Sequence, residues 1–140
     1  MTELVKRINS SLELDKAFAI RKIVFVDGQG VAAEEEYDEF DESANHYIVY
    51  KNGIEVGTAR WRFSDNGVKF ERFAILEECR NQGLGELLLN KMLEDIPSPN
   101  NLYLHAQLPA VSLYERGGFK TVGGTFMECD IEHYKMVRKI

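Results

Sequence analysis

Six residues in the middle of the chain have the types and the spacing of a phosphate-binding turn. They read Arg80-Asn81-Gln82-Gly83-Leu84-Gly85, and they lie between an apolar strand-like run (70–76) and a helix-like run (84–95). The start of a helix leaves several backbone N–H groups without partners, all pointing the same way, where they can hold a phosphate group. The simpler interpretation of this glycine turn, residues 80–85, is a helix that merely begins with glycines.

The surrounding elements predict an α/β fold with a mixed sheet. Ser10, with Glu13 three residues on, is a capping-box pattern that opens a helix. Asn52-Gly53 is the strongest short-range signal for a hairpin. Apolar periodicity predicts the other boundaries. We expect strands over 4–8, 47–51, 54–63, 68–76, 101–106, 119–122 and 125–140, helices over 11–28, 84–95 and 109–116, and a loop or short helix over 34–43.

Length and composition indicate an ordinary globular protein. With 140 residues, of which 44% are hydrophobic and 29% charged, we expect one domain over 1–140. No apolar run approaches the length of a membrane helix, and the N-terminus does not resemble a secretory signal. Cys79 and Cys129 form no metal-ligand spacing with the three histidines. These features predict a cytoplasmic protein that uses no membrane and no metal.

The charge is unevenly distributed along the chain. The net charge is −6, and seven of the 23 acids fall within residues 34–42, so the rest of the chain has 16 acids and 17 bases. This balance offers no basic surface for nucleic acid. The acidic run suits a cationic small molecule, and a solvated acidic loop is the plainer alternative.

Three classes of glycine-rich phosphate site compete for residues 80–85. A P-loop requires Gly-Lys-Ser/Thr, where this chain has Gly85-Glu86-Leu87. A dinucleotide fingerprint requires a small residue where Leu88 stands. The glycine turn instead resembles the (Q/R)-x-x-G-x-(G/A) acetyl-CoA motif of the GCN5-related N-acetyltransferase (GNAT) superfamily. Leu113-Tyr114-Glu115-Arg116-Gly117-Gly118-Phe119 resembles the second motif of the same superfamily, in the right order and at a workable spacing.

The resemblance extends over nearly the whole chain, to a small bacterial ElaA-like branch. It is carried by residues 21–26, Glu39 and Asp41, 56–60, 105–107, His133 and Met136. The chain departs from this branch at Asp27-Gly28-Gln29, where an acid-glutamine pair is usual, and at Glu132, where proline is common. The resemblance implies a GNAT fold, a strongly twisted mixed sheet of about six to seven strands flanked by about four helices, which splays near its middle.

For the cosubstrate, the resemblance implies acetyl-CoA and no metal. It assigns the diphosphate to the amides of residues 81–85. The cofactor-binding residues of the turn are then Arg80, Asn81, Gln82, Gly83, Leu84 and Gly85. Backbone groups of Phe73, Ala74 and Ile75 would pair with the pantetheine arm, although their alternation equally suits a core strand. Gln107 would contact the cofactor with its amide, and the plain alternative is a helix cap.

For the chemistry, the resemblance makes Tyr114 the general acid. A phenol of pKa ~10 can protonate a leaving thiolate of pKa ~8.5, and the alternative is an aromatic ring packed on the sheet with its hydroxyl bonded to backbone. A base is needed because an amine is almost wholly protonated at neutral pH. Glu71 is the first candidate base, acting directly or through water, with Glu128 and His133 in reserve. The competing interpretation pairs Glu71 with Arg72 or Lys69.

The predicted function is transfer of the acetyl group of acetyl-CoA to a primary amine, directly, within a ternary complex. The acceptor is expected to be a small molecule or a peptide, and the protein a monomer or a homodimer. The alternatives are a non-catalytic acyl-CoA sensor or interaction module, which would bind the cofactor without turnover, and a nucleotide-binding regulatory domain.

Overall fold

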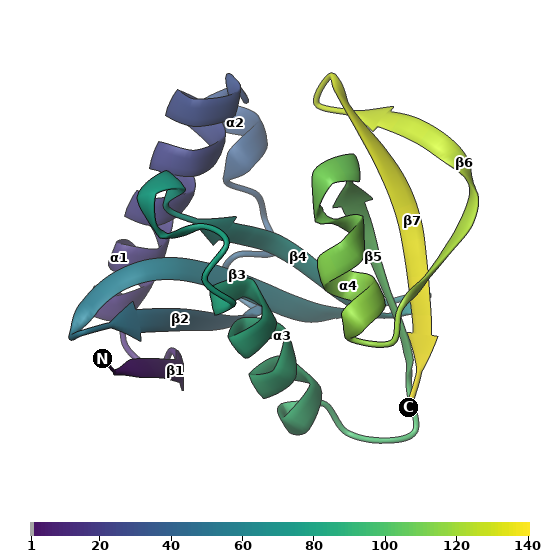
Figure 1. The fold of residues 1–140 in the computed structure, drawn as a ribbon, viewed down its shortest axis with the longest axis horizontal. Helices are drawn as coiled ribbons and strands as arrows, with labels where there is room; N and C mark the ends of the chain where they lie inside the picture. The colour runs from purple at the N-terminus through teal and green to yellow at the C-terminus, as the bar shows by residue number, and fades with distance from the viewer. Residues whose placement is uncertain (1) are drawn as a thin grey trace.

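The computed structural model describes residues 2–140, which form a seven-stranded mixed sheet with helices on both faces (Figure 1). The strands are β1 (Glu3–Arg7), β2 (Asn45–Lys51), β3 (Ile54–Ser64), β4 (Gly67–Ile75), β5 (Asn101–Gln107), β6 (Lys120–Glu128) and β7 (Ile131–Lys139). The helices are α1 (Ser11–Arg21), α2 (Ala33–Glu36), α3 (Leu84–Asp95) and α4 (Val111–Arg116). Shorter helical turns are η1 (Lys22–Asp27), η2 (Glu77–Cys79) and η3 (Leu108–Ala110). The mixed α/β architecture predicted from the sequence is confirmed.

The sheet is an antiparallel meander joined to a second antiparallel group by one parallel pair. Its strand order is β1-β2-β3-β4-β5-β7-β6, and only β4 and β5 run parallel. The predicted hairpin at Asn52-Gly53 is present, with left-handed φ angles of 53° and 82°. Two helices therefore connect strands that run in the same direction: α3 joins β4 to β5, and α4 joins β5 to β6, which lies beyond β7. The first of these connections begins in the glycine turn.

The C-terminal hairpin differs from the sequence prediction. We expected a break at Gly123-Gly124, but β6 runs through both glycines, which form an irregularity where the pairing with β7 shifts register. The reversal occurs at Cys129-Asp130, whose φ angles are 51° and 62°. A glycine within a strand can indicate a bulge as well as a turn. The Cys129-Asp130 pair contains no glycine, so there was no strong sequence signal for a hairpin there.

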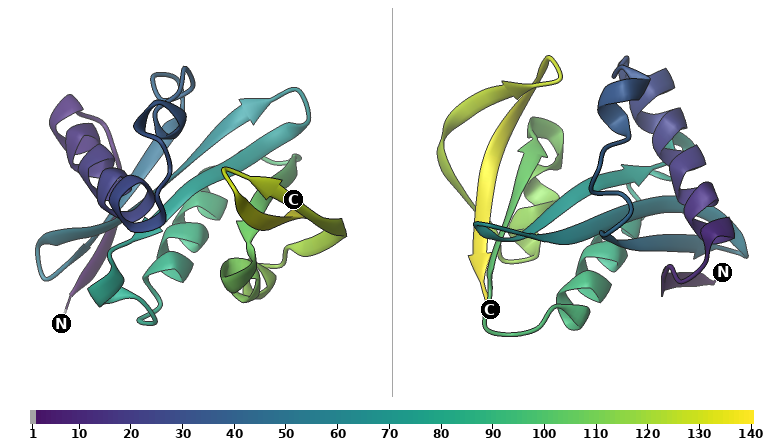
Figure 2. Two further views of the ribbon diagram at one scale, coloured as in Figure 1. Left: turned by 90° about the horizontal axis from the view of Figure 1, so that it is seen from above. Right: turned by 180° about the vertical axis from the view of Figure 1, so that it is seen from behind.

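The helices form two layers around the sheet. α1 and α2 lie over one face near β2 to β4, and α3 and α4 cover the opposite face (Figure 2). The main core lies on the α3 side, where Leu88 and Leu89 pack among Trp61, Phe70 and Leu104, all at most 3% exposed. No helix within residues 2–140 is long and apolar enough to cross a membrane.

The two central strands separate after a short parallel contact. β4 and β5 pair only from Val68–Phe70 to Leu102–Leu104, and both strands then continue without pairing with each other. Close to the point of separation, the β3–β4 register shifts, and Arg72 adopts a left-handed φ of 59°. The expected splay is present, and it opens the sheet on the side where the glycine turn lies.

Candidate active site

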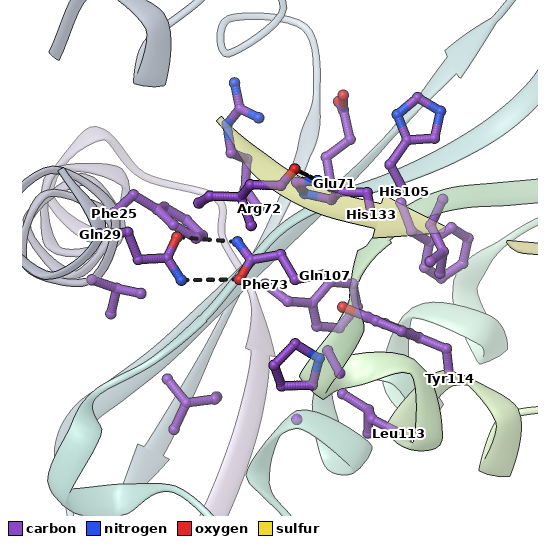
Figure 3. Close-up of a pocket in the computed structure, with 18 of the residues that line it drawn as sticks. Phe25, Gln29, Glu71, Arg72, Phe73, His105, Gln107, Leu113, Tyr114 and His133 are labelled. Carbon is purple, nitrogen blue, oxygen red and sulfur yellow. Dashed lines mark hydrogen bonds between the residues drawn. The ribbon is translucent and has the colours of Figure 1, made fainter. Parts of the chain in front are cut away.

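A cavity of about 540 Å³ occupies the opening between β4 and β5, a volume in the range of small-molecule sites (Figure 3). The residues that line it come from the glycine turn, β4, the end of β5, α4 and the β6–β7 hairpin. They include Gln29, Glu71, Arg72, Phe73, Ile75, Arg80, Asn81, Gly83, Leu84, Gly85, His105, Gln107, Leu113, Tyr114, Glu128 and His133. The opening thus joins residues that are far apart in sequence.

The glycine turn has the backbone geometry of an anion site. Gly83 is the N-cap of α3, with φ 79° and ψ 10°, and no side chain caps the helix. The first bond at this helix start runs from the Leu87 amide to the Gly83 carbonyl, at 3.1 Å, so the amides of residues 84–86 have no intrahelical acceptor. A Cβ at Gly83 would meet nothing within 4 Å. Open space beside oriented amides fits a diphosphate group.

The six residues of the glycine turn have different contacts: five line the cavity, and the Gln82 side chain bonds elsewhere. Arg80, Asn81, Gly83, Leu84 and Gly85 line the cavity. The Gln82 side chain instead accepts a hydrogen bond from Lys51. A Cβ at Gly85 would lie 3.0 Å from Leu113 Cδ2, so this glycine also allows α3 and α4 to pack closely. The sequence interpretation, which gave both glycines one purpose, misses this packing role.

The β4 segment alternates between the two faces of the sheet. Phe73 and Ile75 line the cavity, whereas Ala74 is buried on the other face with Ile20 and Val24. The Ile75 carbonyl accepts a hydrogen bond from Arg80 Nε at 3.0 Å. Any contact made by Ala74 in the cavity would therefore use its backbone and not its side chain.

The left-handed Arg72 is held by the segment around α2. Its Nε donates to the Glu36 carbonyl at 3.3 Å, and its Nη2 lies 3.2 Å from Asp38 Oδ2. A left-handed backbone costs a non-glycine residue roughly 1 kcal/mol, and these contacts help to offset that cost. The bulge that turns β4 away from β5 is thus fixed from the other side of the sheet.

Tyr114 presents its hydroxyl to the cavity. The residue is 6% exposed, and its ring packs edge-on against Phe73 at 5.2 Å between centroids. Within residues 2–140 the hydroxyl has no hydrogen-bond partner, and no fully buried side-chain polar atom is left unpaired, so the oxygen must open onto the cavity. The backbone-bonded alternative considered above is not observed. Burial raises the pKa of Tyr114, so its proton is held more tightly than in a free phenol.

Glu71 lies among three cationic side chains. Its carboxylate is 2.9 Å from Arg60, 2.8 Å from Arg62 and 3.2 Å from Lys69. Burial alone would raise its pKa, but the hydrogen bond from Arg62 and the surrounding positive charges lower it. A carboxylate stabilised in this way is a weak proton acceptor at neutral pH.

Two histidines face the cavity from β5 and β7. His133 Nδ1 is 2.6 Å from the Ile131 carbonyl, which can only accept, so Nδ1 carries the proton and the neutral ring keeps a lone pair on Nε2. His105 Nδ1 is 3.2 Å from Glu128, and this hydrogen bond lowers the pKa of Glu128. No group of three or more His, Cys, Asp or Glu residues within 2–140 has a geometry that could hold a metal ion.

A pair of amides crosses the opening. Gln107, at the end of β5, and Gln29, just after η1, exchange two side-chain hydrogen bonds of 3.0 Å each (Figure 3). The sequence pattern indicated a role for Gln107 but none for Gln29, which is 78 residues away. The one available signal was the unusual Asp27-Gly28-Gln29 stretch. Two glutamines at this point can bind any amide or carbonyl group that enters between the strands.

Three of the seven acids in residues 34–42 face inward. Glu36, Asp38 and Asp41 bind Arg21 and Arg60, which are 1% and 0% exposed. Together with Glu71 they form what we call the arginine cluster, made of Arg21, Glu36, Asp38, Asp41, Arg60 and Glu71. Burial opposes ionisation of Asp38, but Arg60 and Arg72 lower its pKa to about 2. Much of the acidic run is therefore neutralised within the fold.

Comparison with known proteins identifies a consistent set of relatives. A family model described as an acetyltransferase (GNAT) domain matches residues 23–140. A Bacillus subtilis protein, "Uncharacterized N-acetyltransferase YjcF", is 35% identical over 130 residues, which cover 90% of this chain and 92% of that protein. The structure of Escherichia coli ElaA superimposes with a TM-score of 0.86 at 26% identity, covering 99% of this chain and 100% of ElaA. An acyl-CoA N-acyltransferase from Pseudomonas aeruginosa gives 0.81 at 25% identity, covering 99% of both chains.

Proposed function

Since the chain belongs to the GNAT acetyltransferase family and is thus an acetyl-CoA-dependent acyltransferase, we propose that it acetylates a primary amine by direct transfer within a ternary complex. One observation carries the proposal. The opening between β4 and β5 has unpartnered helix-start amides at one end and the free hydroxyl of Tyr114 beside it. If the amides hold the diphosphate of acetyl-CoA, the pantetheine arm can run along β4 and carry the thioester at its far end toward Tyr114.

In this proposal the cofactor is bound mainly by backbone. The amides of residues 81–85 hold the diphosphate, and Gly83 leaves space for it. The Arg80 amide already donates to the Glu77 carbonyl at 3.3 Å. Backbone groups of Phe73, Ala74 and Ile75 pair with the pantetheine arm like an added strand, and Gln107 offers its amide. When bound, acetyl-CoA supplies an acetyl group activated as a thioester.

Tyr114 acts on the leaving sulfur. Its raised pKa keeps the hydroxyl protonated at neutral pH, so it is always ready to donate. The same rise makes full proton transfer to a thiolate of pKa ~8.5 less favourable than for an ordinary phenol. We therefore propose that Tyr114 stabilises the departing thiolate chiefly by hydrogen bonding, in a site that excludes water.

His133 is the better proposal for the base. His133 lines the cavity and its Nε2 has no protein partner within residues 2–140, whereas the Glu71 carboxylate is already engaged by Arg60, Arg62 and Lys69. His133 can use its Nε2 lone pair to accept a proton from the acceptor's ammonium group, which frees the amine to attack. Glu71 stays a hypothesis in which it acts through water, and Glu128 is bonded to His105.

The experiment is release of coenzyme A from acetyl-CoA in the presence of polyamines, aminosugars and peptides with free N-termini or lysines. We expect thiol release with at least one of these classes. Gly83→Ala tests the cofactor site, because it forces a side chain into a left-handed turn beside the open space. We expect its affinity for coenzyme A, measured by calorimetry, to fall by roughly tenfold.

The matched control is Gly124→Ala, at a glycine that also has open space but no left-handed φ. Its affinity for coenzyme A should equal that of the wild type. Binding of coenzyme A without thiol release from any amine would instead identify a sensor. Absence of binding would refute the cofactor site itself.

A further inference from the structure

A second hollow, of about 690 Å³, lies over β5, β7 and β6, outside the cavity described above. Four of its ten lining residues are lysine or arginine, and no aspartate or glutamate lines it. Its principal residues are Tyr103, Lys120, Lys135, Val137, Arg138 and Lys139. We call it the lysine hollow. It stands out in a chain whose net charge is −6.

Strand register places the three lysines on one face of the sheet. Val137 of β7 pairs with both Tyr103 of β5 and Lys120 of β6. Side chains two residues apart on a strand share a face, so Lys135 and Lys139 flank Val137 on the same side as Lys120. α4 packs on the opposite face, among Leu104 and Met136, and α1 and α2 lie away from β6 and β7 (Figure 2).

These cations have no counterions in the fold. Within residues 2–140, none of Lys120, Lys135, Arg138 and Lys139 lies within 4 Å of a carboxylate. Lys135 Nζ instead sits 5.6 Å from the centre of the Tyr103 ring, and Arg138 donates to the Gly117 carbonyl at 2.5 Å. Unpaired like charges around one hollow repel one another, and an anion would relieve that repulsion. A second copy of the same face would increase it.

The lysine hollow adjoins the acceptor side of the active site. Lys135 is the register partner of His105, which lines the main cavity, and the next pair on this face toward the cofactor is Gln107 with His133. From His133 to Val137 is four residues along β7, or roughly 13 Å at 3.3 Å per residue. A molecule lying along this face would have one end at His133 and the other among the lysines.

We propose that the lysine hollow binds an anionic group of the acceptor, so that the substrate is an amine carrying a phosphate or carboxylate about 10–13 Å away. This inference rests on the proposed function for the amine end, while the anion site itself stands on the lysine hollow alone. The two ends of the acceptor are then recognised by opposite chemistry: His133 meets the amine, and Lys120, Lys135 and Lys139 meet the anion.

The first test measures the anion site directly. Inorganic phosphate is titrated into the protein with coenzyme A already present, and backbone amide NMR shifts are followed. We expect shifts at Lys120, Lys135 and Lys139, and a roughly tenfold weaker response in the double variant Lys120→Gln/Lys135→Gln. Lys22→Gln, at an exposed lysine paired with Asp27 on the other side of the molecule, is the control and should leave the titration unchanged. No shift at the three lysines in the wild type would overturn the proposal.

The second test asks whether the anion belongs to the acceptor. Triglycine is compared with its C-terminal amide, and 6-aminohexyl phosphate with 6-aminohexanol, in the coenzyme A release assay. We expect KM to be about tenfold lower for the charged member of at least one pair, and the double variant to remove that preference while kcat stays within twofold. The pair that shows the preference tells carboxylate from phosphate.

The outcomes separate this inference from the proposed function. Equal KM values within both pairs, with turnover intact, would refute the anionic acceptor and leave the acetyltransferase assignment standing. No turnover with any amine would refute the proposed function and the acceptor assignment with it, whereas the phosphate titration would still decide the anion site. Phosphate shifts that do not weaken in the double variant would also count against the lysine hollow.

Discussion

Two regions of the molecule differ in whether their polar groups have hydrogen-bond partners in the protein. They are the opening between β4 and β5 and the arginine cluster on the other face of β4. In the opening, helix-start amides, the Tyr114 hydroxyl and the Nε2 atom of His133 have no protein partners within the described residues. In the arginine cluster, Arg60 alone makes five side-chain hydrogen bonds, to Asp38, Asp41 and Glu71. The polar groups of the opening are therefore available to bind a ligand, whereas those of the arginine cluster are already paired with one another.

The two regions are connected through β4. Arg72 binds the segment around α2 with its side chain, while its left-handed backbone and the neighbouring Phe73 border the opening. The contacts around the arginine cluster therefore help to hold the backbone that borders the opening. Changes to the arginine cluster should appear as lost stability, and changes in the opening as lost turnover.

The largest effect should come from Arg60→Leu. Removing a fully buried guanidinium leaves the carboxylates of Asp38, Asp41 and Glu71 without their shared partner. We expect the free energy of unfolding, from urea titration, to fall by about 3–5 kcal/mol. The control is Lys91→Ala, whose partially exposed lysine pairs with Asp95, and it should change stability by less than about 1 kcal/mol. A loss of similar size in both variants would contradict the distinction between the regions.

Tyr114→Phe should have the opposite effect: it should lower turnover and leave the free energy of unfolding nearly unchanged. The hydroxyl has no protein partner, so its removal should leave the free energy of unfolding within about 0.5 kcal/mol of the wild type. If it stabilises the departing thiolate, kcat should fall by about a hundredfold, or roughly 2.7 kcal/mol, with the affinity for coenzyme A unchanged. Steady-state kinetics and calorimetry on the same preparation measure both. An unaltered kcat would remove Tyr114 from the chemistry.

The link between the regions can be tested at Arg72 with two substitutions. Arg72→Gly and Arg72→Ala lose the same side-chain hydrogen bonds, but only glycine adopts a φ of 59° without strain. The glycine variant should therefore be more stable than the alanine variant by about 1 kcal/mol in urea titration. Equal stabilities would mean that the left-handed backbone at Arg72 relaxes when the side chain is lost.

Local patterns in the sequence predicted what local chemistry decides. The helix start at Gly83, the cap at Ser10 and the turn at Asn52-Gly53 each depend on residues only a few positions apart. The hairpin at Cys129-Asp130 was the exception, because this pair contains no glycine and the nearby Gly123-Gly124 pair gave the stronger turn signal. The order of elements was predicted well because each periodic run is long enough to be unambiguous.

Contacts between residues far apart in the sequence could not be predicted from local patterns. The acids of residues 34–42 look like one solvated face in the sequence, yet the segment after α2 brings Asp41 between Arg21 of α1 and Arg60 of β3. The pairing of Gln29 with Gln107 joins the end of η1 to the end of β5 and has no local signal. Similarly, the sequence offered Arg72 or Lys69 as a partner for the candidate base Glu71, and Lys69 does pair with it. Arg60 and Arg62, which come from β3, had no signal in the strand that carries Glu71.

The smallest expected effect is the loss of stability at low pH that follows protonation of the Asp38 carboxylate. Its pKa is lowered to about 2 in the fold, below an unfolded value of ~3.9, so its ion pairs stabilise the protein above about pH 4. That contribution should disappear as the pH falls from about 4 to 2. Because the Asp38 side chain is still 27% exposed, we expect less than about 1 kcal/mol from this source.

Asp38→Asn isolates this contribution, because the amide keeps the shape of the side chain and removes its charge. The stability difference between wild type and variant, from urea titrations at pH 7, 4 and 2.5, should shrink as the pH falls. Asp65→Asn, in the exposed turn between β3 and β4, is the control for loss of charge alone. A difference that persists unchanged at pH 2.5 would mean that Asp38 acts through geometry and not through its charge. The arginine cluster would then be a hydrogen-bonded scaffold more than an electrostatic one, and its contrast with the opening would be one of packing.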